Sequence, residues 1–367
     1  MDILFLIISL IYIILHLLFL YGYVRSSSLK KQTHKNKLSV SVIVAARNEE
    51  TIIANCIKFL RNLKYDKDLL EIILVNDKST DKTKEIMINE TIGYEQFKVI
   101  DSNNLETTSL KGKANAIDTA IRKASGDIIF TTDADCEVPE NWIEETVKYY
   151  DDRTSMVCGF TLIKAHKSLF AKMQSLDWIY LLSIASCSSG IKMILSCLGN
   201  NLTFTRNVYN EIGGYSNVGF SVTEDLALMR TIDADKRYDL KYPLNHRAIV
   251  MTEPCNSLKE LYNQKRRWFR GGTDINYLGY ILGFELYAMN FVLLFGFLFI
   301  DPFAYLLFVL IKILSELLIT VPVYKKLKIK NLFKYYPLFQ IYFAIYGLLL
   351  PLSFVFGKRI NWKERKF

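Results

Sequence analysis

The sequence predicts an α/β domain of soluble character, set between apolar segments that cross a membrane. Residues 3–23 contain no Asp, Glu, Lys or Arg, and this run has the length that a helix needs to cross a bilayer. A second apolar block extends from residue 285 to residue 356. Between the two, short β-branched runs alternate with segments of helical periodicity, which is typical of a parallel sheet with crossover helices.

The composition is that of a membrane protein. Apolar residues make up 51% of the 367 residues, and the net charge is +9. The basic residues crowd beside the apolar runs, which fits cytoplasmic flanks of membrane segments and anionic lipid headgroups. We therefore expect membrane lipids as partners and no nucleic acid.

The first apolar run predicts an N-terminal transmembrane helix over residues 1–24. A cleavable signal peptide is the alternative, but the run exceeds the 7–15 apolar residues of such peptides and no A-x-A site follows. Basic residues follow it at once, beginning with Arg25, Lys30 and Lys31. Because Lys and Arg mark the cytoplasmic side, the sequence predicts a multi-pass protein with a cytosolic central domain.

The C-terminal block, residues 285–356, predicts two or three further membrane helices. Phe291–Ile300 and Phe303–Val323 form the arms of a hairpin, with its turn at Asp301-Pro302. Lys312 and Glu316 are spaced i,i+4, so we expect them to pair inside the membrane as a packing pair rather than as a proton relay.

The last apolar run, Leu338–Phe356, has two interpretations. If it crosses the membrane, the basic residues that follow from Lys358 lie outside, contrary to the charge rule. It is otherwise a re-entrant or interfacial segment. The sequence leaves both open.

Residues 38–275 predict a single α/β domain. The expected strands are Ser39–Ala46, Glu71–Val75, Lys98–Ile100 and Asp127–Thr132, and the expected helices are Glu49–Leu63, Asp81–Asn89 and Lys113–Ala124. Asp77, Asp133 and Asp135 each follow a strand. Ligands of such sheets bind at the carboxyl ends of the strands, so we expect the functional site there.

Asp133 and Asp135 are candidate metal ligands. Alternate residues at a strand end can direct two carboxylates at one point. Mg²⁺ or Mn²⁺ commonly takes one or two carboxylates together with substrate phosphates. A lone Asp-Ala-Asp triplet is more often a turn or a cap.

Two further segments carry candidate chemistry. Thr223-Glu224-Asp225 is either a helix start with a Thr cap or the location of a general base, with Asp225 as that base and Glu224 beside it. Gln264, Arg267 and Trp268 lie on a helical stretch. They form either an interfacial collar or a site for a sugar and a phosphate.

Taken in order, these segments resemble one family. They are SVIVAARNE at 41–49, VND at 75–77, KGKANA at 111–116, DAD at 133–135, TED at 223–225 and Gln264-x-x-Arg267-Trp268. The set is similar to inverting family 2 glycosyltransferases of the GT-A fold. The membrane branch of that family includes cellulose, hyaluronan and poly-N-acetylglucosamine synthases and ceramide glucosyltransferases.

The resemblance implies roles for individual residues. Ala45, Arg47, Glu49, Asp77 and Lys113 would bind the nucleotide-sugar donor, a UDP-sugar by family expectation. Asp133 and Asp135 would contact the diphosphate and a Mg²⁺ or Mn²⁺ cofactor. Asp225 would be the base with Glu224 beside it, and Gln264, Arg267 and Trp268 would serve the acceptor and diphosphate side. Ala46 departs from the family, where a proline is common.

Three functions follow from the resemblance and are weighed against one another. The favoured one transfers a single sugar to a lipid or lipid-linked acceptor at the cytosolic membrane face. The alternative is a processive synthase of an exported glycan, for which three or four spans are few. A non-catalytic scaffold or transporter is the distant alternative, because every acidic residue expected for catalysis is present.

Residues 166–198 are expected either to lie at the membrane interface or to form a buried helix pair.

Overall fold

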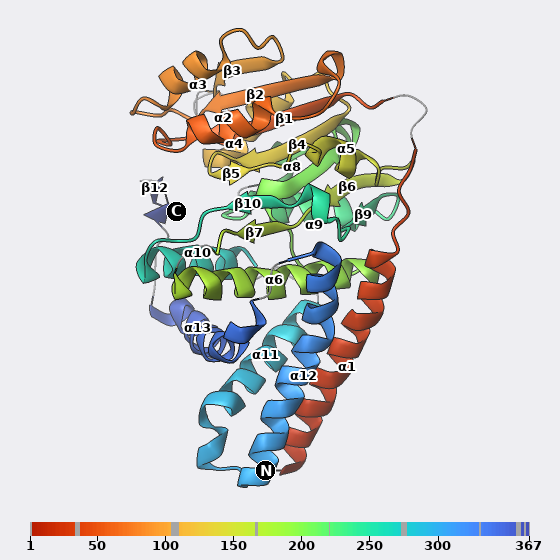
Figure 1. Cartoon of the computed structure of the whole chain (residues 1–367), viewed down its shortest axis with the longest axis vertical. Coiled ribbons are helices and arrows are strands. Elements are labelled where there is room, and N and C mark those ends of the chain that lie inside the picture. Colours follow the sequence, from red (N-terminus) through yellow and green to blue (C-terminus); the bar gives the residue numbers. More distant parts are fainter. Residues whose placement is uncertain are drawn as a thin grey trace. The chain divides into compact units, whose positions relative to one another are not determined.

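The computed structural model describes residues 2–33, 37–103, 110–165, 168–219, 221–272, 277–329, 332–356, 361–362 and 365–366, with side chains from Leu4 to Leu352. The chain divides into two compact units (Figure 1). One unit comprises Leu29–Leu162 and Cys197–Glu253, and we call it the sheet unit. The other comprises Met1–Ser28, Ile163–Ser196 and Pro254–Phe367, and we call it the helical unit. Both units are discontinuous in sequence, whereas the predicted domain at 38–275 is one continuous stretch whose boundaries stay a prediction.

The sheet unit is built on a seven-stranded sheet in the order β3-β2-β1-β4-β8-β6-β9. The strands, in that order, are Phe97–Asp101, Leu70–Asn76, Val40–Ala46, Ile128–Asp133, Leu202–Thr205, Thr154–Cys158 and Asp239–Lys241. The first four are parallel, and β8 runs antiparallel to both β4 and β6. The predicted parallel sheet is therefore confirmed for β1 to β4, and the sheet as a whole is mixed.

A second sheet of three strands has the order β5-β10-β7. These strands are Cys136–Glu137, Val250–Thr252 and Thr161–Ile163. The helices of the sheet unit are α2 (Ile53–Arg61), α3 (Thr83–Thr91), α4 (Gly112–Ile121), α5 (Trp142–Val147), α7 (Arg206–Glu211), α8 (Gly214–Val218) and α9 (Glu224–Ala234).

The apolar pattern explains these elements. Every residue of β2 is buried, as is every residue of β1 except Ala45, because parallel strands are covered on both faces. Helix α2 buries Ile53, Cys56, Ile57 and Leu60, which recur at the spacing of one helical face. These side chains join the strands in a single apolar core.

Helix α2 begins at Ile53, four residues later than the predicted start at Glu49. Residues 48–50 instead form a loop, in which Asn48 has a φ of 53° and backbone amides bond to side chains that follow β2. The amide of Glu49 donates to Thr83 Oγ1 at 2.7 Å, and that of Glu50 donates to Asp81 Oδ2 at 3.2 Å. Because side chains already accept hydrogen bonds from these amides, Asn48 to Glu50 do not need helical hydrogen bonds and remain in a loop.

The helical unit contains α1 (Asp2–Ser27), α6 (Leu169–Gly190), α10 (Leu258–Gly271), α11 (Tyr277–Phe295), α12 (Pro302–Leu327) and α13 (Tyr336–Phe356). Four stretches are long and apolar enough to cross a membrane: Leu4–Ser27, Tyr277–Leu298, Pro302–Leu327 and Phe333–Leu352. One N-terminal and three C-terminal membrane helices are therefore present by length and composition. Figure 1 shows α1, α11 and α12 running side by side, with α13 crossing near one end of this group.

The predicted turn at Asp301-Pro302 is confirmed, but the first arm is α11 (Tyr277–Phe295) rather than Phe291–Ile300. Asp301 caps α12, and its Oδ1 accepts hydrogen bonds from the amides of Phe303 and Ala304 at 2.9 and 3.2 Å. Residues 273–276 and the basic residues Lys358 and Arg359 lie outside the described residues, so both interpretations of the last apolar run stay predictions.

Helix α6 contradicts the expectation of a helix pair within residues 166–198, whereas the expected position at the membrane interface stays a prediction. Leu169–Gly190 is one helix rather than a helix pair, 17 of its residues are buried, and it contacts α1, α12 and α13. Its contact with α1 is close because both helices carry a glycine there: a Cβ on Gly22 would lie 2.0 Å from the carbonyl oxygen of Cys187. The segment is therefore largely buried and packs in part on α1, α12 and α13.

Lys312 and Glu316 pair as predicted, and they belong to a larger buried network. Lys312 Nζ lies 2.5 Å from Glu316 Oε1 and 2.6 Å from Gln340 Oε1. The hydroxyls of Tyr12 and Tyr336 donate to the Glu316 carboxylate at 2.8 and 2.9 Å. The network joins α1, α12 and α13 through groups that are at least 95% buried.

Candidate functional site in the sheet unit

The acidic residues predicted for the site lie where adjacent parallel strands end. In the strand register Ala45 is paired with Asp133, and Ala46 with Asn76, directly before Asp77. Asp135 follows two residues after the end of β4 and is exposed. The carboxyl edge of the sheet therefore brings Ala45, Asp77 and Asp133 onto neighbouring strands, as the sequence predicted.

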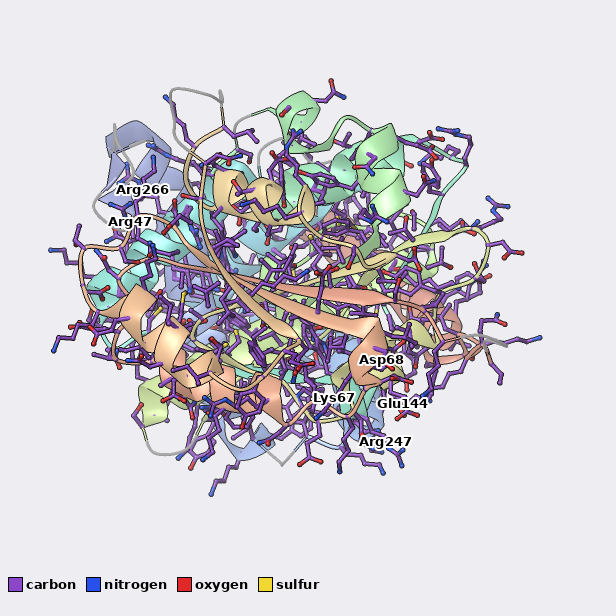
Figure 2. The ribbon with its side chains drawn as sticks, turned by 90° about the horizontal axis from the view of Figure 1, so that it is seen from above. Arg47, Lys67, Asp68, Glu144, Arg247 and Arg266 are labelled. Carbon is purple, nitrogen blue, oxygen red and sulfur yellow. The ribbon has the colours of Figure 1, made fainter. Side chains whose placement is uncertain are left out.

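The loop after β1 is tied to the loop after β2. Arg47 Nη1 donates to the carbonyl oxygen of Asp77 at 3.1 Å, and the amide of Asp77 donates to the carbonyl oxygen of Ala46 at 2.8 Å. The Asp77 side chain is buried and its Oδ1 accepts from Ser102 Oγ at 3.1 Å. In Figure 2, Arg47 lies at one end of the sheet, whereas Lys67 and Asp68, which precede β2, lie at the other. This arrangement confirms that Arg47 and Asp77 share one edge.

Lys113 joins two of the predicted acidic segments. Its Nζ lies 2.5 Å from Asp133 Oδ1 and 3.4 Å from Glu224 Oε1, with only 16% of its side chain exposed. Burial alone would lower the pKa of Lys113, but the negative charges of Asp133 and Glu224 outweigh this effect and raise it. The ammonium is therefore a permanent positive charge between the end of β4 and the start of α9.

Asp225 is held by two backbone amides. Gly199 N–H donates to its Oδ2 at 2.6 Å, and Leu226 N–H donates to its Oδ1 at 2.8 Å. Burial and the neighbouring charge of Glu224 raise the pKa of Asp225 to about 6, although Lys113 and the two amides act in the opposite direction. A carboxylate with such a pKa is ionised at neutral pH and is a stronger base than an ordinary aspartate.

The alternative interpretation of this segment, a helix start capped by threonine, is only partly observed. Thr223 is the N-cap residue of α9, but its side chain makes no capping hydrogen bond. Glu224 and Asp225 do occupy the first helical turn. Gly199 was not singled out from the sequence as a contact of Asp225, because its contribution is a backbone amide that no side-chain pattern reveals.

The donor chemistry at the end of β4 fits a hard divalent cation. Asp133 and Asp135 offer carboxylate oxygens at alternate positions, one partly exposed and one exposed. Among the described residues no group of three or more His, Cys, Asp or Glu side chains is arranged to hold a metal ion. Two carboxylates suffice where phosphate oxygens of a substrate and water complete the shell.

Gln264, Arg267 and Trp268 belong to the helical unit, on α10. This helix is capped by Ser257, whose Oγ accepts from the amide of Glu260 at 3.2 Å. The ring centroid of Trp268 lies 5.4 Å from that of Trp178 on α6. The three residues are thus carried by a well-formed helix, and their predicted role stays a prediction.

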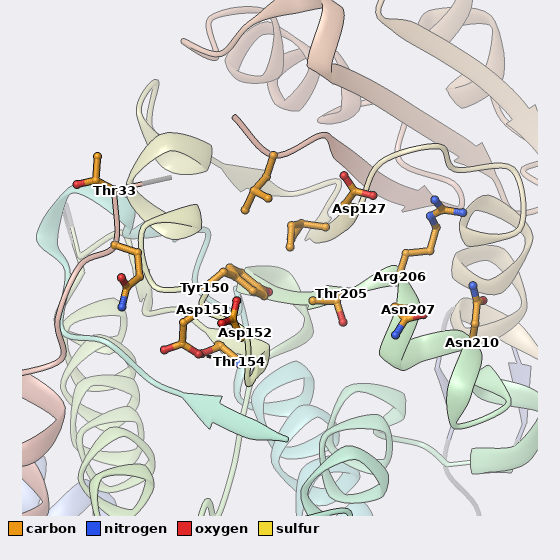
Figure 3. A pocket seen from close by; sticks show the side chains of 13 residues that line it. Thr33, Asp127, Tyr150, Asp151, Asp152, Thr154, Thr205, Arg206, Asn207 and Asn210 are labelled. Carbon is orange, nitrogen blue, oxygen red and sulfur yellow. Dashed lines mark hydrogen bonds between the residues drawn. The ribbon is translucent and has the colours of Figure 1, made fainter. Parts of the chain in front are cut away.

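A cavity of about 640 Å³ lies at the opposite edge of the sheet (Figure 3). Its lining includes Asp127 and Ile128 at the start of β4, Thr205 at the end of the antiparallel β8, and Thr154 at the start of β6. A second cavity, of about 830 Å³, is lined by Asn76 and by residues 79–82 in the loop after β2. Only the second cavity is at the edge where the predicted donor residues lie.

Comparisons with known proteins agree with this geometry. The sequence model described as "Glycosyl transferase family 2" matches residues 41–224. The chain is 27% identical over 256 residues to "Probable glycosyltransferase YdaM" of Bacillus subtilis, covering 67% of this chain and 58% of that protein.

Two other curated relatives have more specific names. The chain is 27% identical to "Beta-monoglucosyldiacylglycerol synthase" of Nostoc, covering 66% of this chain and 50% of that protein. It is 26% identical to "Poly-beta-1,6-N-acetyl-D-glucosamine synthase" of Staphylococcus epidermidis, covering 68% of this chain and 58% of that protein. The chain thus spans only 50% to 58% of the length of these three relatives.

Among solved structures, the mannosyltransferase PcManGT from Pyrobaculum calidifontis, in complex with GDP-Man and Mn²⁺, is similar with a TM-score of 0.63. The identity is 16%, and the match covers 97% of this chain and 99% of that one. This similarity supports the GT-A type of fold. With the family match over residues 41–224, half of the sequence, it leads to one conclusion: the chain belongs to glycosyl transferase family 2.

Proposed function

We propose that this protein transfers one sugar from a nucleotide-diphosphate sugar, a UDP-sugar in the first instance, to a hydroxyl of a lipid or lipid-linked acceptor at the cytosolic membrane face, with inversion at the anomeric carbon. The observation that carries the proposal is the convergence of Lys113, Asp133 and Glu224 beside Asp225 in the sheet unit. Family membership supports glycosyl transfer, and the four apolar helices support a membrane location.

Asp225 is the proposed base. Its carboxylate accepts the proton of the acceptor hydroxyl, and the acceptor oxygen forms a bond to the anomeric carbon as the bond from that carbon to the diphosphate oxygen breaks. The electron pair leaves with the nucleoside diphosphate. The amides of Gly199 and Leu226 keep both carboxylate oxygens in fixed positions before the proton moves.

The donor side is proposed to be held by Ala45, Arg47, Glu49 and Asp77 for the nucleoside, with Lys113 near the diphosphate. Lys113 offsets the charges of Asp133 and Glu224, so an anionic donor meets less repulsion at this edge. A Mg²⁺ or Mn²⁺ ion bound by Asp133 and Asp135 would neutralise charge on the leaving diphosphate. Gln264, Arg267 and Trp268 are proposed to serve the acceptor and diphosphate side.

The two candidate functions, transfer to a lipid and synthesis of a glycan, differ in the acceptor of the sugar. The relative named beta-monoglucosyldiacylglycerol synthase supports a lipid acceptor, and the relative named poly-beta-1,6-N-acetyl-D-glucosamine synthase supports a growing glycan. Four candidate spans are few for enclosing a polymer channel within one chain, so we favour the lipid acceptor. The cytosolic orientation rests on the basic residues that follow the first span.

The test is nucleotide release by the full-length protein in lipid nanodiscs. A panel of UDP- and GDP-sugars is supplied with Mn²⁺ or Mg²⁺ and a membrane lipid extract. We expect release from one donor, abolished by EDTA and reduced at least a hundredfold in Asp225→Asn. Asp233→Asn, on the same helix but in partial contact with solvent, is the matched control and keeps activity.

The products separate the alternatives. A lipid that gains one sugar, with the anomeric configuration opposite to that of the donor, supports the proposal. A ladder of polymer lengths would favour the processive synthase. Unchanged release by Asp225→Asn would refute the assignment of the base, and no release from any donor by the wild-type protein would refute the proposed activity.

A further inference from the structure

One face of α6 holds the segment that carries Gln264, Arg267 and Trp268. Gln174 makes two hydrogen bonds to the backbone just before α10. Its Oε1 accepts from the amide of Cys255 at 2.8 Å, and its Nε2 donates to the carbonyl oxygen of Cys255 at 3.0 Å. This pair of bonds mimics a strand pairing and fixes the backbone three residues before α10 begins. Gln174 is fully buried, so the bonds do not compete with water.

The next turn of α6 holds α10 itself. Asp177, with no exposed side-chain surface, forms an ion pair with Lys265, whose side chain is 5% exposed. The hydroxyl of Tyr346 on α13 donates to Asp177 Oδ1. The Lys265 ammonium also lies 4.9 Å from the ring centroid of Trp268 and 5.0 Å from that of Tyr346. Trp178 adds a ring contact to Trp268.

These contacts fix the rotation of α10 about its axis. At about 100° per residue, Trp268, Gln264 and Arg267 lie about 60°, 100° and 160° around the helix from Lys265, all in the same direction. Lys265 therefore lies about 60° outside one edge of the arc that the three residues occupy. A slip of one residue against Asp177 would turn every member of the arc by about 100°.

The ion pair is a costly way to stabilise a helix contact. Apolar pairs of similar volume commonly replace a buried ion pair without loss of stability, because the desolvation of two charges offsets their attraction. An apolar pair is less directional than an ion pair, so it discriminates less between alternative registers of a helix. The Asp177–Lys265 pair is therefore better explained by the orientation that it imposes on α10 than by the stability that it contributes.

We propose that Asp177, supported by Tyr346, is a positioning residue: its ion pair with Lys265 sets the register of α10, and thereby the presentation of Gln264, Arg267 and Trp268 to the acceptor and diphosphate side. This inference rests on the proposed function for the role of the three residues. The register itself does not depend on that function.

The test compares two ways of removing the pair in the full-length protein. Asp177→Asn leaves Lys265 without its partner charge, and the double variant Asp177→Leu with Lys265→Met replaces the pair by apolar side chains. We expect Asp177→Asn to lower the melting temperature and the double variant to restore it. In both, kcat for nucleotide release falls on the order of 10- to 100-fold, because a small misplacement of a catalytic segment has effects of that size.

A readout without activity follows the register directly. Trp178 and Trp268 are close enough to give an exciton signal in the circular dichroism spectrum, and Trp178→Phe defines the spectrum without it. We expect the double variant to lose this signal while its melting temperature is restored. A double variant with wild-type kcat and an intact exciton signal would overturn the inference.

If the double variant does not fold, Tyr346→Phe decides, since it removes only the hydrogen bond to Asp177. A fall in kcat of about threefold or more supports the inference, and wild-type kcat overturns it. If wild-type protein releases no nucleotide, the proposed function fails, and the exciton signal of the same variants still tests the register of α10.

Discussion

A substitution at Gly199 tests whether its amide controls the proposed base. A Cβ at this position would lie 3.1 Å from both Cβ and Oδ2 of Asp225, closer than ordinary contact, so Gly199→Ala must push the carboxylate away from the amide that now donates to it at 2.6 Å. A hydrogen bond to a charged group contributes about 1.5–3 kcal/mol, and 1.36 kcal/mol corresponds to one pKa unit. Complete loss of the bond would raise the pKa of Asp225 by about 1–2 units, which is the upper limit of the effect.

The sign follows from which form the bond stabilises. The amide stabilises the ionised carboxylate, so losing it favours the protonated form, which cannot accept the acceptor proton. If the bond is lost completely, the acidic limb of kcat/KM moves from a pKa of about 6 to about 7–8, and a weakened bond gives a smaller shift in the same direction. With complete loss, the ionised fraction at pH 7 falls from about nine tenths to between a half and a tenth, and activity falls with it about two- to ninefold.

The assay is the pH dependence of kcat/KM for nucleotide release between pH 5 and 9.5. We expect Gly199→Ala to approach wild-type activity at the alkaline end of this range, because Asp225 is ionised there in both the variant and the wild-type protein. Gly283→Ala is the matched control, because its Cβ would meet nothing within 4 Å. A uniform loss at every pH, with the acidic limb unmoved, would refute the conclusion that Asp225 is the titrating base.

Three further predictions concern buried charges. Lys113→Met leaves Asp133 without its counter-charge, and we expect UDP to bind at least tenfold more weakly by calorimetry, while an unchanged affinity would count against a diphosphate role. Although burial opposes it, hydrogen bonding from Lys98 and Ser41 lowers the pKa of Glu71 to about 2. This stability is present above the unfolded pKa and is lost as pH falls through about 2, so Glu71→Gln should cost about 3 kcal/mol near pH 7 and little at pH 2, measured by denaturant unfolding. Lys312→Met isolates the Glu316 charge and should lower the melting temperature in detergent, whereas adding Glu316→Met should restore it; equal melting in all three proteins would contradict the importance of the pair.

The parts of the fold that were predicted are those with a local signature. Strands β1, β2 and β4 are buried on both faces, which produces short continuous apolar runs that a sequence displays directly. Strands β8 and β9 were not predicted. They have four and three residues, and their pairing with β4 and β6 joins segments more than 70 residues apart. Nothing in so short a run distinguishes a strand from a loop until its partner is known.

The site shows the same division. That Asp77 and Asp133 lie at one edge follows from the parallel order of their strands. That Lys113 reaches Glu224 does not, because α4 and α9 meet only through the packing of the whole unit. The contact of Gly199 with Asp225 is harder still to predict, because its donor is a backbone amide, which every residue except proline has.

The network around Glu316 has a consequence for the biosynthesis of the protein. Tyr12 and Glu316 are 304 residues apart, so at about 5–20 residues per second α1 waits about 15–60 s in the bilayer before its partner is made. During that interval the hydroxyl of Tyr12 faces lipid without the carboxylate acceptor that it later has. Insertion of α12 ends the wait. A ribosome that stops before α12 therefore leaves α1 in the membrane with a hydroxyl that lacks its acceptor, which is unfavourable in lipid.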